Sequence, residues 1–181
     1  RDIIITEKKE NLVSELRQAY ERIPKDAIDR AVAFVKRSRV SASGAFAYRP
    51  EEASNAETLS GAGILCLELC GRHLDADSLA AAKYLETVYR QSLAGDAPST
   101  FYGLYYASQG LFQLGGKHWR EFGVWMYNTW LPKQREDGSW RATGSEAGPA
   151  YSTAMTVLAL TVPYRMLPIY QRDETVNEDE D

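Results

Sequence analysis

Apolar residues recur along most of the chain at the three- and four-residue spacing of helices, without the sustained two-residue alternation of strands. Glycines and prolines interrupt this pattern at regular points, and Asp75 stands where it can cap a helix. The pattern predicts helices over residues 6–22, 26–38, 57–70, 75–92, 100–114, 117–134 and 150–165. The chain is therefore predicted to be all-α, with about seven helices.

The predicted helices are of two alternating kinds. One kind is amphipathic and charged, over residues 26–38, 75–92 and 117–134. The other kind is apolar on nearly every side, over residues 57–70, 100–114 and 150–165. A helix that is apolar all round needs neighbours on most sides, whereas an amphipathic helix can face solvent. The alternation predicts helical hairpins in two layers, with the apolar helices inside.

Short segments repeat along the chain at a spacing of about 45 residues. Residues 67–73 (LELCGRH) align with residues 112–118 (FQLGGKH), and residues 43–46 (SGAF) resemble residues 137–140 (DGSW) two periods later. Periods of about 20 to 50 residues are typical of arrays built from one repeated structural unit. We expect three hairpins and a leading helix.

The turn after the third amphipathic helix resembles a known repeat. Residues 130–140 (WLPKQREDGSW) are similar to the QW repeat of squalene–hopene cyclases and related terpenoid cyclases, with an aromatic–aliphatic pair, Gln134, and then Gly138 and Trp140. A glutamine here could satisfy loose carbonyls of the helix end and amides of the next helix, with the tryptophan stacked over it. We expect Gln134, Gly138 and Trp140 to form a structural clasp between hairpins, without a catalytic role.

Residues 34–46 resemble a diverged copy of this repeat, with Gly44 and Phe46 as clasp residues and Arg39 in place of the glutamine. Residues 151–160 resemble the inner helix that follows such a turn in the cyclases and in protein prenyltransferase β subunits. Over roughly residues 26–172, the resemblance implies an α/α toroid, in which inner helices surround a cavity.

Cyclases of this family close the toroid with about six hairpins, and this chain supplies about half of them. We therefore expect an incomplete ring, which is an excised part, a naturally short arc, or a half that a partner completes. The initial Arg1 favours an excised part.

Charge is distributed unevenly. Six of the 25 acidic residues lie in the last nine positions, which leaves 21 basic residues against 19 acidic ones elsewhere. This near-neutral body has no basic field for nucleic acid. We interpret residues 1–172 as the helical domain and residues 173–181 as an acidic, disordered tail. The sequence shows no apolar run of about 20 residues and no signal-peptide core, so it leaves the compartment open.

The acid motif of squalene-type cyclases is incomplete in this chain. Asp75-Ala-Asp77 is the nearest match to their Asp-x-Asp-Asp, and its position at a helix start predicts a capping role. The sequence lacks an Asp-Asp-x-x-Asp cluster for metal-bound diphosphate. Ser152 and Thr153 stand where the resemblance to prenyltransferases implies a zinc-binding cysteine.

Cys66, Cys70 and His73 have a spacing that could suit a soft metal ion. In the second copy of the repeat, His118 takes the place of His73, but the cysteines are not repeated. We therefore expect the cysteines to be small core residues, the histidines to complete helix ends, and the chain to hold neither a metal nor a cofactor.

Aromatic residues are dense between residues 101 and 140, where eleven occur. Tyr102 and Tyr106 share one face of a predicted inner helix, and Tyr105 lies beside them. Tyr151 opens the next inner helix at a similar level, and Glu57 is the matching position in the first. If this face borders a cavity, these residues could hold an apolar ligand or stabilise a cation. Alternatively, the rings fill a wide core.

Two hypotheses for function follow. In the first, the chain is a prenyltransferase- or squalene-cyclase-like repeat domain that binds an apolar small molecule or a protein partner without a complete catalytic motif. In the second, it is the C-terminal part of a terpenoid cyclase or prenyltransferase-like enzyme whose acid or metal motif lies outside this chain. An incomplete ring would expose the flank of a terminal hairpin, so self-association is also expected.

Overall fold

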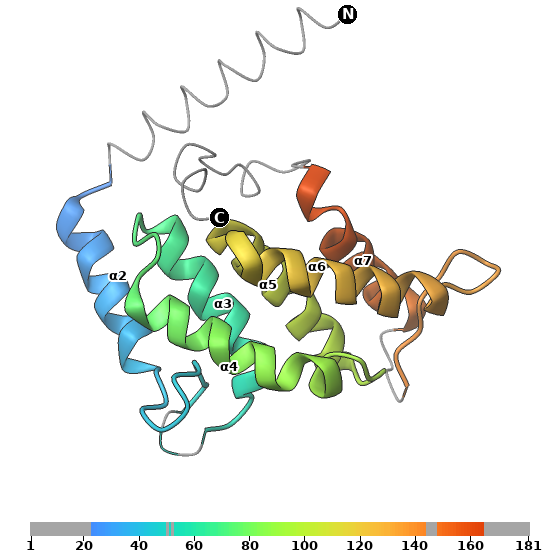
Figure 1. Cartoon of the computed structure of the whole chain (residues 1–181), viewed down its shortest axis with the longest axis horizontal. Helices are drawn as coiled ribbons and strands as arrows, with labels where there is room; N and C mark the ends of the chain where they lie inside the picture. The colour runs from blue at the N-terminus through green and yellow to red at the C-terminus, as the bar shows by residue number, and fades with distance from the viewer. Residues whose placement is uncertain (1–22, 50, 52, 144–147, 165–181) are drawn as a thin grey trace, which may run out of the picture. The chain divides into compact units, whose positions relative to one another are not determined.

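The structure is a computed structural model that describes residues 23–49, 51, 53–143 and 148–164 (Figure 1). The described residues form α2 (Lys25–Arg37), α3 (Ala56–Leu69), α4 (Ala76–Ser92), α5 (Pro98–Leu114), α6 (Gly116–Trp130) and α7 (Gly148–Leu160), with 3-10 helices η1 (Leu131–Lys133) and η2 (Val162–Tyr164). Within this part of the chain, β structure is limited to one bridge between Arg39 and Phe46. The predicted all-α class is confirmed.

The six helices predicted between residues 26 and 165 are all present, and proline explains the largest shifts of their ends. Pro132 and Pro163 lack an amide hydrogen, so neither α6 nor α7 continues through them, and a 3-10 turn follows each helix. The helix predicted over residues 6–22 and the tail predicted over residues 173–181 lie outside the described residues. No helix in the described ranges is long and apolar enough to cross a bilayer.

The chain divides between Phe34 and Val35 into two compact units, and this boundary falls inside α2. In the first unit, α2 carries an ion pair one helical turn long, with 2.6 Å between Lys25 Nζ and a carboxylate oxygen of Asp29. A similar pair joins Arg30 to Asp26. Such pairs stabilise an exposed helix modestly.

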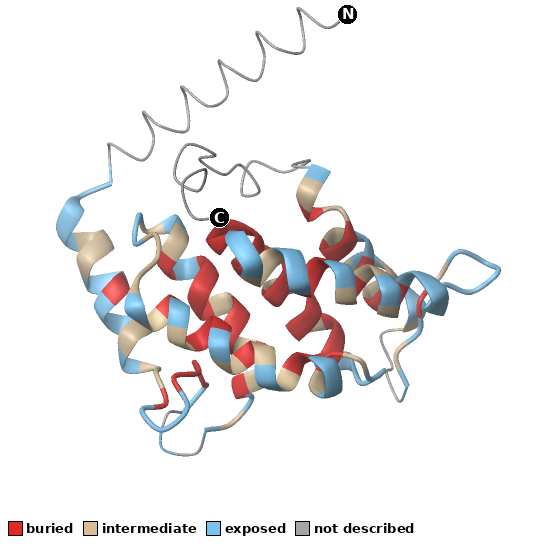
Figure 2. Ribbon diagram, viewed as in Figure 1, coloured by how far each residue is buried: buried red, intermediate tan, exposed pale blue. Residues whose placement is uncertain are grey.

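In the second unit, α3, α5 and α7 lie next to one another with α5 in the middle (Figure 1). Helix α4 packs mainly on α3, α6 packs mainly on α5, and these two helices also touch each other. Buried residues are concentrated on α3 and α5, whereas α4 and α6 also present exposed residues (Figure 2). The apolar helices are thus neighbours, as their alternation with amphipathic helices predicted. The toroid remains a prediction.

Helices α3 and α5 approach each other closely at their glycines. A Cβ atom added to Gly110 would lie 2.4 Å from the carbonyl oxygen of Gly61, and one added to Gly61 would lie 2.4 Å from the backbone nitrogen of Ala107. Toward the start of the two helices, Gly103 likewise faces Thr58. The contacts advance in the same direction along both helices, so α3 and α5 run parallel.

Candidate functional site

The turn that follows α6 is held by Trp140, which is only 4% exposed. Its indole N–H donates to the carbonyl oxygen of Trp130, the last residue of α6, over 2.8 Å. Its backbone N–H donates to the hydroxyl of Thr153 over 3.0 Å, and the hydroxyl of Ser152 donates to its carbonyl oxygen over 2.5 Å. Trp140 therefore ties the end of α6 to the first turns of α7.

Gln134 has a different role from the predicted one. Its side-chain amide donates to the carbonyl oxygen of Gly138 over 3.0 Å, and both residues are exposed. Gly138 has a φ of 81°, which favours glycine and allows this tight turn. Gln134 thus closes the turn between residues 134 and 138. The carbonyl oxygen at the end of α6, on Trp130, accepts its hydrogen bond from the indole of Trp140 instead.

The diverged copy at Gly44 and Phe46 makes a matching backbone contact. Phe46 is buried, and its backbone N–H donates to the hydroxyl of Ser60 on α3 over 3.1 Å. Gly44 has a φ of 78°, and a Cβ atom there would lie 2.8 Å from a side-chain carbon of α4. The backbone N–H groups of Phe46 and Trp140 therefore each donate to a hydroxyl group of the next apolar helix. Sequence reasoning missed these hydroxyls, because serine and threonine inside an apolar helix carry no motif of their own.

Asp75 caps α4, as its position predicted, and accepts a hydrogen bond from the backbone N–H of Asp77 over 2.9 Å. Lys36 Nζ lies 2.7 Å from a carboxylate oxygen of Asp75 and 3.2 Å from one of Asp77, and Arg39 Nε lies 3.1 Å from Asp77. Desolvation acts to raise the pKa of Asp75, but hydrogen bonds from Lys36 and the Asp77 backbone hold this pKa below its ordinary value. A carboxyl group that stays ionised is a poor acid for protonating an alkene.

The two cysteines do not occupy the same environment. Cys66 is exposed, so its predicted role as a core residue is wrong, while Cys70 is half-buried at the end of α3. Cys66 lies about 140° around α3 from Gly61, which faces α5, and the described helices therefore leave it uncovered. No group of three or more His, Cys, Asp or Glu side chains in the described ranges is placed to hold a metal ion.

Each histidine has a carboxylate partner, which differs from the predicted completion of helix ends. Nδ1 of His73 lies 2.6 Å from the carboxylate of Glu68, near the end of α3. Nδ1 of His118 lies 2.5 Å from a carboxylate oxygen of Glu86, and this contact joins the first turn of α6 to α4. The aligned histidines of the repeat thus take partners from different helices.

Tyr102, Tyr105 and Tyr106 form a cluster of half-buried rings on α5. The ring centroids of Tyr102 and Tyr106 are 4.6 Å apart, and those of Tyr105 and Tyr106 are 4.9 Å apart. Tyr151 of α7 is also half-buried, and its hydroxyl donates to the carbonyl oxygen of Pro98 on the first turn of α5 over 3.4 Å. We call these four tyrosines the tyrosine face.

The phenol groups of the tyrosine face influence one another. Burial raises the pKa of Tyr106, and interactions with Tyr102, Tyr105 and Cys66 raise it further. Burial and the proximity of Tyr102 likewise raise the pKa of Tyr151. The phenols of Tyr106 and Tyr151 are therefore uncharged at neutral pH, and they offer rings and neutral hydroxyl groups to a ligand.

Glu57, the remaining predicted ligand-binding candidate, lies beside a different helix. Burial raises the pKa of Tyr84 on α4, and the negative charge of Glu57 raises it further, which places Glu57 near Tyr84. Tyr84 itself packs against a small core cluster that includes Val40, Ala45 and Ala56. Glu57 is half-buried at the first turn of α3.

Gln109 is a further residue of interest that sequence reasoning missed. It lies three residues after Tyr106 and seven after Tyr102, on the same side of α5, and is 1% exposed. Neither polar atom of its side-chain amide has a hydrogen-bond partner among the described residues. A buried amide without a partner costs free energy, so it marks a position where a polar group could add a favourable contact.

Comparisons of the chain with family models, with curated proteins and with solved structures found no match. The likeness to terpenoid cyclases therefore rests on the residues of the repeat and remains a prediction.

Proposed function

We propose that this chain is a helical-repeat binding domain that holds an apolar molecule against the tyrosine face. The observation that carries this proposal is a contrast in burial along α5. The residues next to the three tyrosines are buried, whereas the tyrosines are only half-buried. Phe101, Gly103 and Leu104 are buried, as is every residue from 107 to 114. Rings left half-exposed among buried neighbours are available to a ligand.

The chemistry of the face suits a molecule that is mainly apolar and carries a hydrogen-bonding group. The rings supply apolar area, and their hydroxyl groups supply donors and acceptors. Apolar sites in proteins commonly combine many ring contacts with a few polar groups that orient the ligand.

The binding of the neutral hydrophobic dye Nile red tests this proposal. We expect the double variant Tyr102→Ala, Tyr106→Ala to bind the dye about tenfold more weakly, because two rings of contact area are lost. Tyr48→Ala is the matched control, since Tyr48 is 78% exposed in a loop and should leave binding unchanged. Circular dichroism checks that helix content is kept. Unaltered dye binding by the folded double variant would mean that these rings do not hold the ligand.

Cys66 allows the bound dye to be located, because this residue is exposed and its thiol interacts electrostatically with Tyr106. In a Cys70→Ser background, Cys66 is the single thiol of the chain. Bound dye should slow the alkylation of Cys66, and the double tyrosine variant should lose this protection. Protection that persists in the double variant would place the dye elsewhere.

The ring cluster also favours an alternative proposal, in which the chain is part of a terpenoid cyclase or prenyltransferase-like enzyme whose acid or metal motif lies outside it. Clustered tyrosines can stabilise cations through the electron-rich faces of their rings. Tighter binding of an alkyltrimethylammonium ion than of the matching alkyl alcohol would favour this alternative. Equal or weaker binding of the cation would favour the simple binding domain.

A further inference from the structure

The two cysteines of the chain lie one helical turn apart at the end of α3. The backbone N–H of Cys70 donates to the carbonyl oxygen of Cys66 over 3.0 Å, so the pair has the spacing of a regular helix. Measured around the helix axis from Gly61, which faces α5, Cys66 lies at about 140° and Cys70 at about 180°. Both cysteines therefore share one side of α3, and it is not the side that packs closely on α5.

The two thiols are close enough to influence each other. Although Cys66 is exposed as a residue, desolvation raises the pKa of its thiol, and the neighbouring Cys70 raises it further. Desolvation also raises the pKa of Cys70, and the positive charge of Arg72 opposes this rise. Both thiols are therefore protonated at neutral pH, and an ion that binds them has to displace two protons.

The number of ligands near the thiols decides which metal ion suits them. Among the residues that the structure describes, no group of three or more His, Cys, Asp or Glu side chains is placed to hold a metal. The imidazole of His73 is turned to a carboxylate, with 2.6 Å between its Nδ1 and an oxygen of Glu68. A structural zinc site needs four ligands. Cu(I) prefers soft sulfur ligands and accepts two of them in line.

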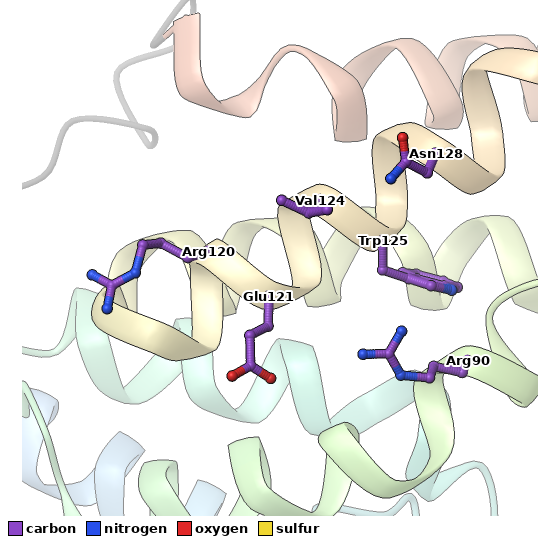
Figure 3. A pocket seen from close by; sticks show the side chains of 6 residues that line it. All are labelled: Arg90, Arg120, Glu121, Val124, Trp125 and Asn128. Carbon is purple, nitrogen blue, oxygen red and sulfur yellow. The ribbon is translucent and has the colours of Figure 1, made fainter.

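The open hollow between α4 and α6 offers a contrast, because its lining has no ligand for a soft ion (Figure 3). The lining residues come from α4 and α6, and none of them carries a sulfur atom or an imidazole: Arg90, Arg120, Glu121, Val124, Trp125 and Asn128. Binding of a soft ion is therefore expected at the thiols and not in this hollow.

We propose that Cys66 and Cys70 together bind one Cu(I) ion between their two sulfur atoms. One Cu⁺ and two thiols give a two-coordinate complex with a charge of −1 and two released protons. Two sulfur atoms in line with the ion would be about 4.5 Å apart, twice a metal–sulfur bond length. Side chains four positions apart on a helix, with Cβ atoms about 5–6 Å apart, can reach this separation. The site needs neither His73 nor a copy in the repeat, so it replaces the sequence-based expectation that the chain holds no metal.

Competition with the Cu(I) chelator bicinchoninate, under anaerobic conditions with ascorbate as reductant, measures the Kd of this site. We expect one Cu(I) per chain, and a loss of affinity of about a hundredfold or more in Cys66→Ser and in Cys70→Ser, because a single thiol cannot chelate the ion. His73→Gln is the matched control and should leave the Kd unchanged. Circular dichroism checks that each variant keeps its helix content.

The pH dependence of the Kd counts the displaced protons. Since both thiols are protonated near neutral pH, a rise of one pH unit should tighten binding by up to about a hundredfold, against about tenfold for a single thiol. Bound Cu(I) should also protect both cysteines from alkylation by iodoacetamide.

Wild-type affinity in either serine variant would overturn the proposal, as would the pH dependence of a single thiol or the absence of 1:1 binding. An equal loss of affinity in His73→Gln would overturn it as well, because the site would then have a third ligand. The variant Tyr102→Ala, Tyr106→Ala should still bind one Cu(I), so this result is independent of the proposed function.

Discussion

At the scale of single residues, Phe46 and Trp140 are each held by a hydroxyl group that accepts one hydrogen bond and donates another. Ser60 accepts from the backbone of Phe46 and donates to the carbonyl oxygen of Ala56 over 2.7 Å. Thr153 accepts from the backbone of Trp140 and donates to its carbonyl oxygen over 3.2 Å. Polar groups that are paired in this way avoid the cost of burial, so both sites suit the interior.

We predict that Trp140→Ala lowers the free energy of unfolding by roughly 3 kcal/mol, the usual loss when a buried aromatic ring is removed. The variant Trp140→Phe should lose less, about 1 kcal/mol, because it keeps most of the ring but not the indole donor to Trp130. Urea denaturation followed by circular dichroism measures both. A loss below about 0.5 kcal/mol for Trp140→Ala would refute the clasp.

Single-residue roles were predictable from the sequence where the backbone alone decides them. Asp75 caps α4 because a carboxylate before a helix reaches free amides whatever surrounds it. Gln134 and Cys66 were assigned wrongly, because their surroundings depend on the path of a turn and on which side of α3 is covered. The same limit explains why the lack of a partner for Gln109 could not be foreseen.

At the scale of elements, the parallel packing of α3 and α5 has the spacing of the sequence repeat. Thr58 faces Gly103, Gly61 faces Ala107, and residue 64 faces residue 110, so the partners are 45 or 46 positions apart. Successive hairpins therefore lie beside each other with little shift along the helix axis. The period predicted this arrangement of neighbours, but the small residues at the contact were not predicted, because no single helix requires them.

We predict that Gly110→Ala lowers the free energy of unfolding by about 2 kcal/mol, since its Cβ atom would lie 2.4 Å from a backbone oxygen of α3 and the helices would have to separate. Gly123→Ala is the matched control on α6, where the nearest atom to an added Cβ lies 3.6 Å away. Because alanine favours a helix over glycine, this control should gain up to about 1 kcal/mol. Similar effects of the two substitutions on thermal unfolding would argue against a close α3–α5 contact.

At the scale of the whole molecule, the apolar helices that the structure describes pack one on the next, in the order α3, α5, α7. Helix α7 packs on α5 and α6, and near its end Val157 and Tyr164 are exposed. Apolar side chains that are exposed on the surface favour association with another copy.

We predict concentration-dependent self-association through this end of α7, measured by sedimentation velocity. Val157→Lys should shift the equilibrium toward monomer, because it places a charge on a side chain that is 43% exposed. Leu79→Lys is the matched control on α4, with a similar exposure of 39%. Monomer alone at millimolar concentration would contradict the prediction.

The position of α7 also makes the lifetime of a ligand bound to the tyrosine face depend on local unfolding of this helix. The tyrosine face takes three rings from α5, which has helices on several sides, and its fourth ring from α7, which has fewer described neighbours. Segments with fewer packing partners open more often than central ones. A brief detachment of α7 would carry Tyr151 away and leave the rest of the face in place, so the lifetime of a bound molecule would follow the opening rate of this one helix.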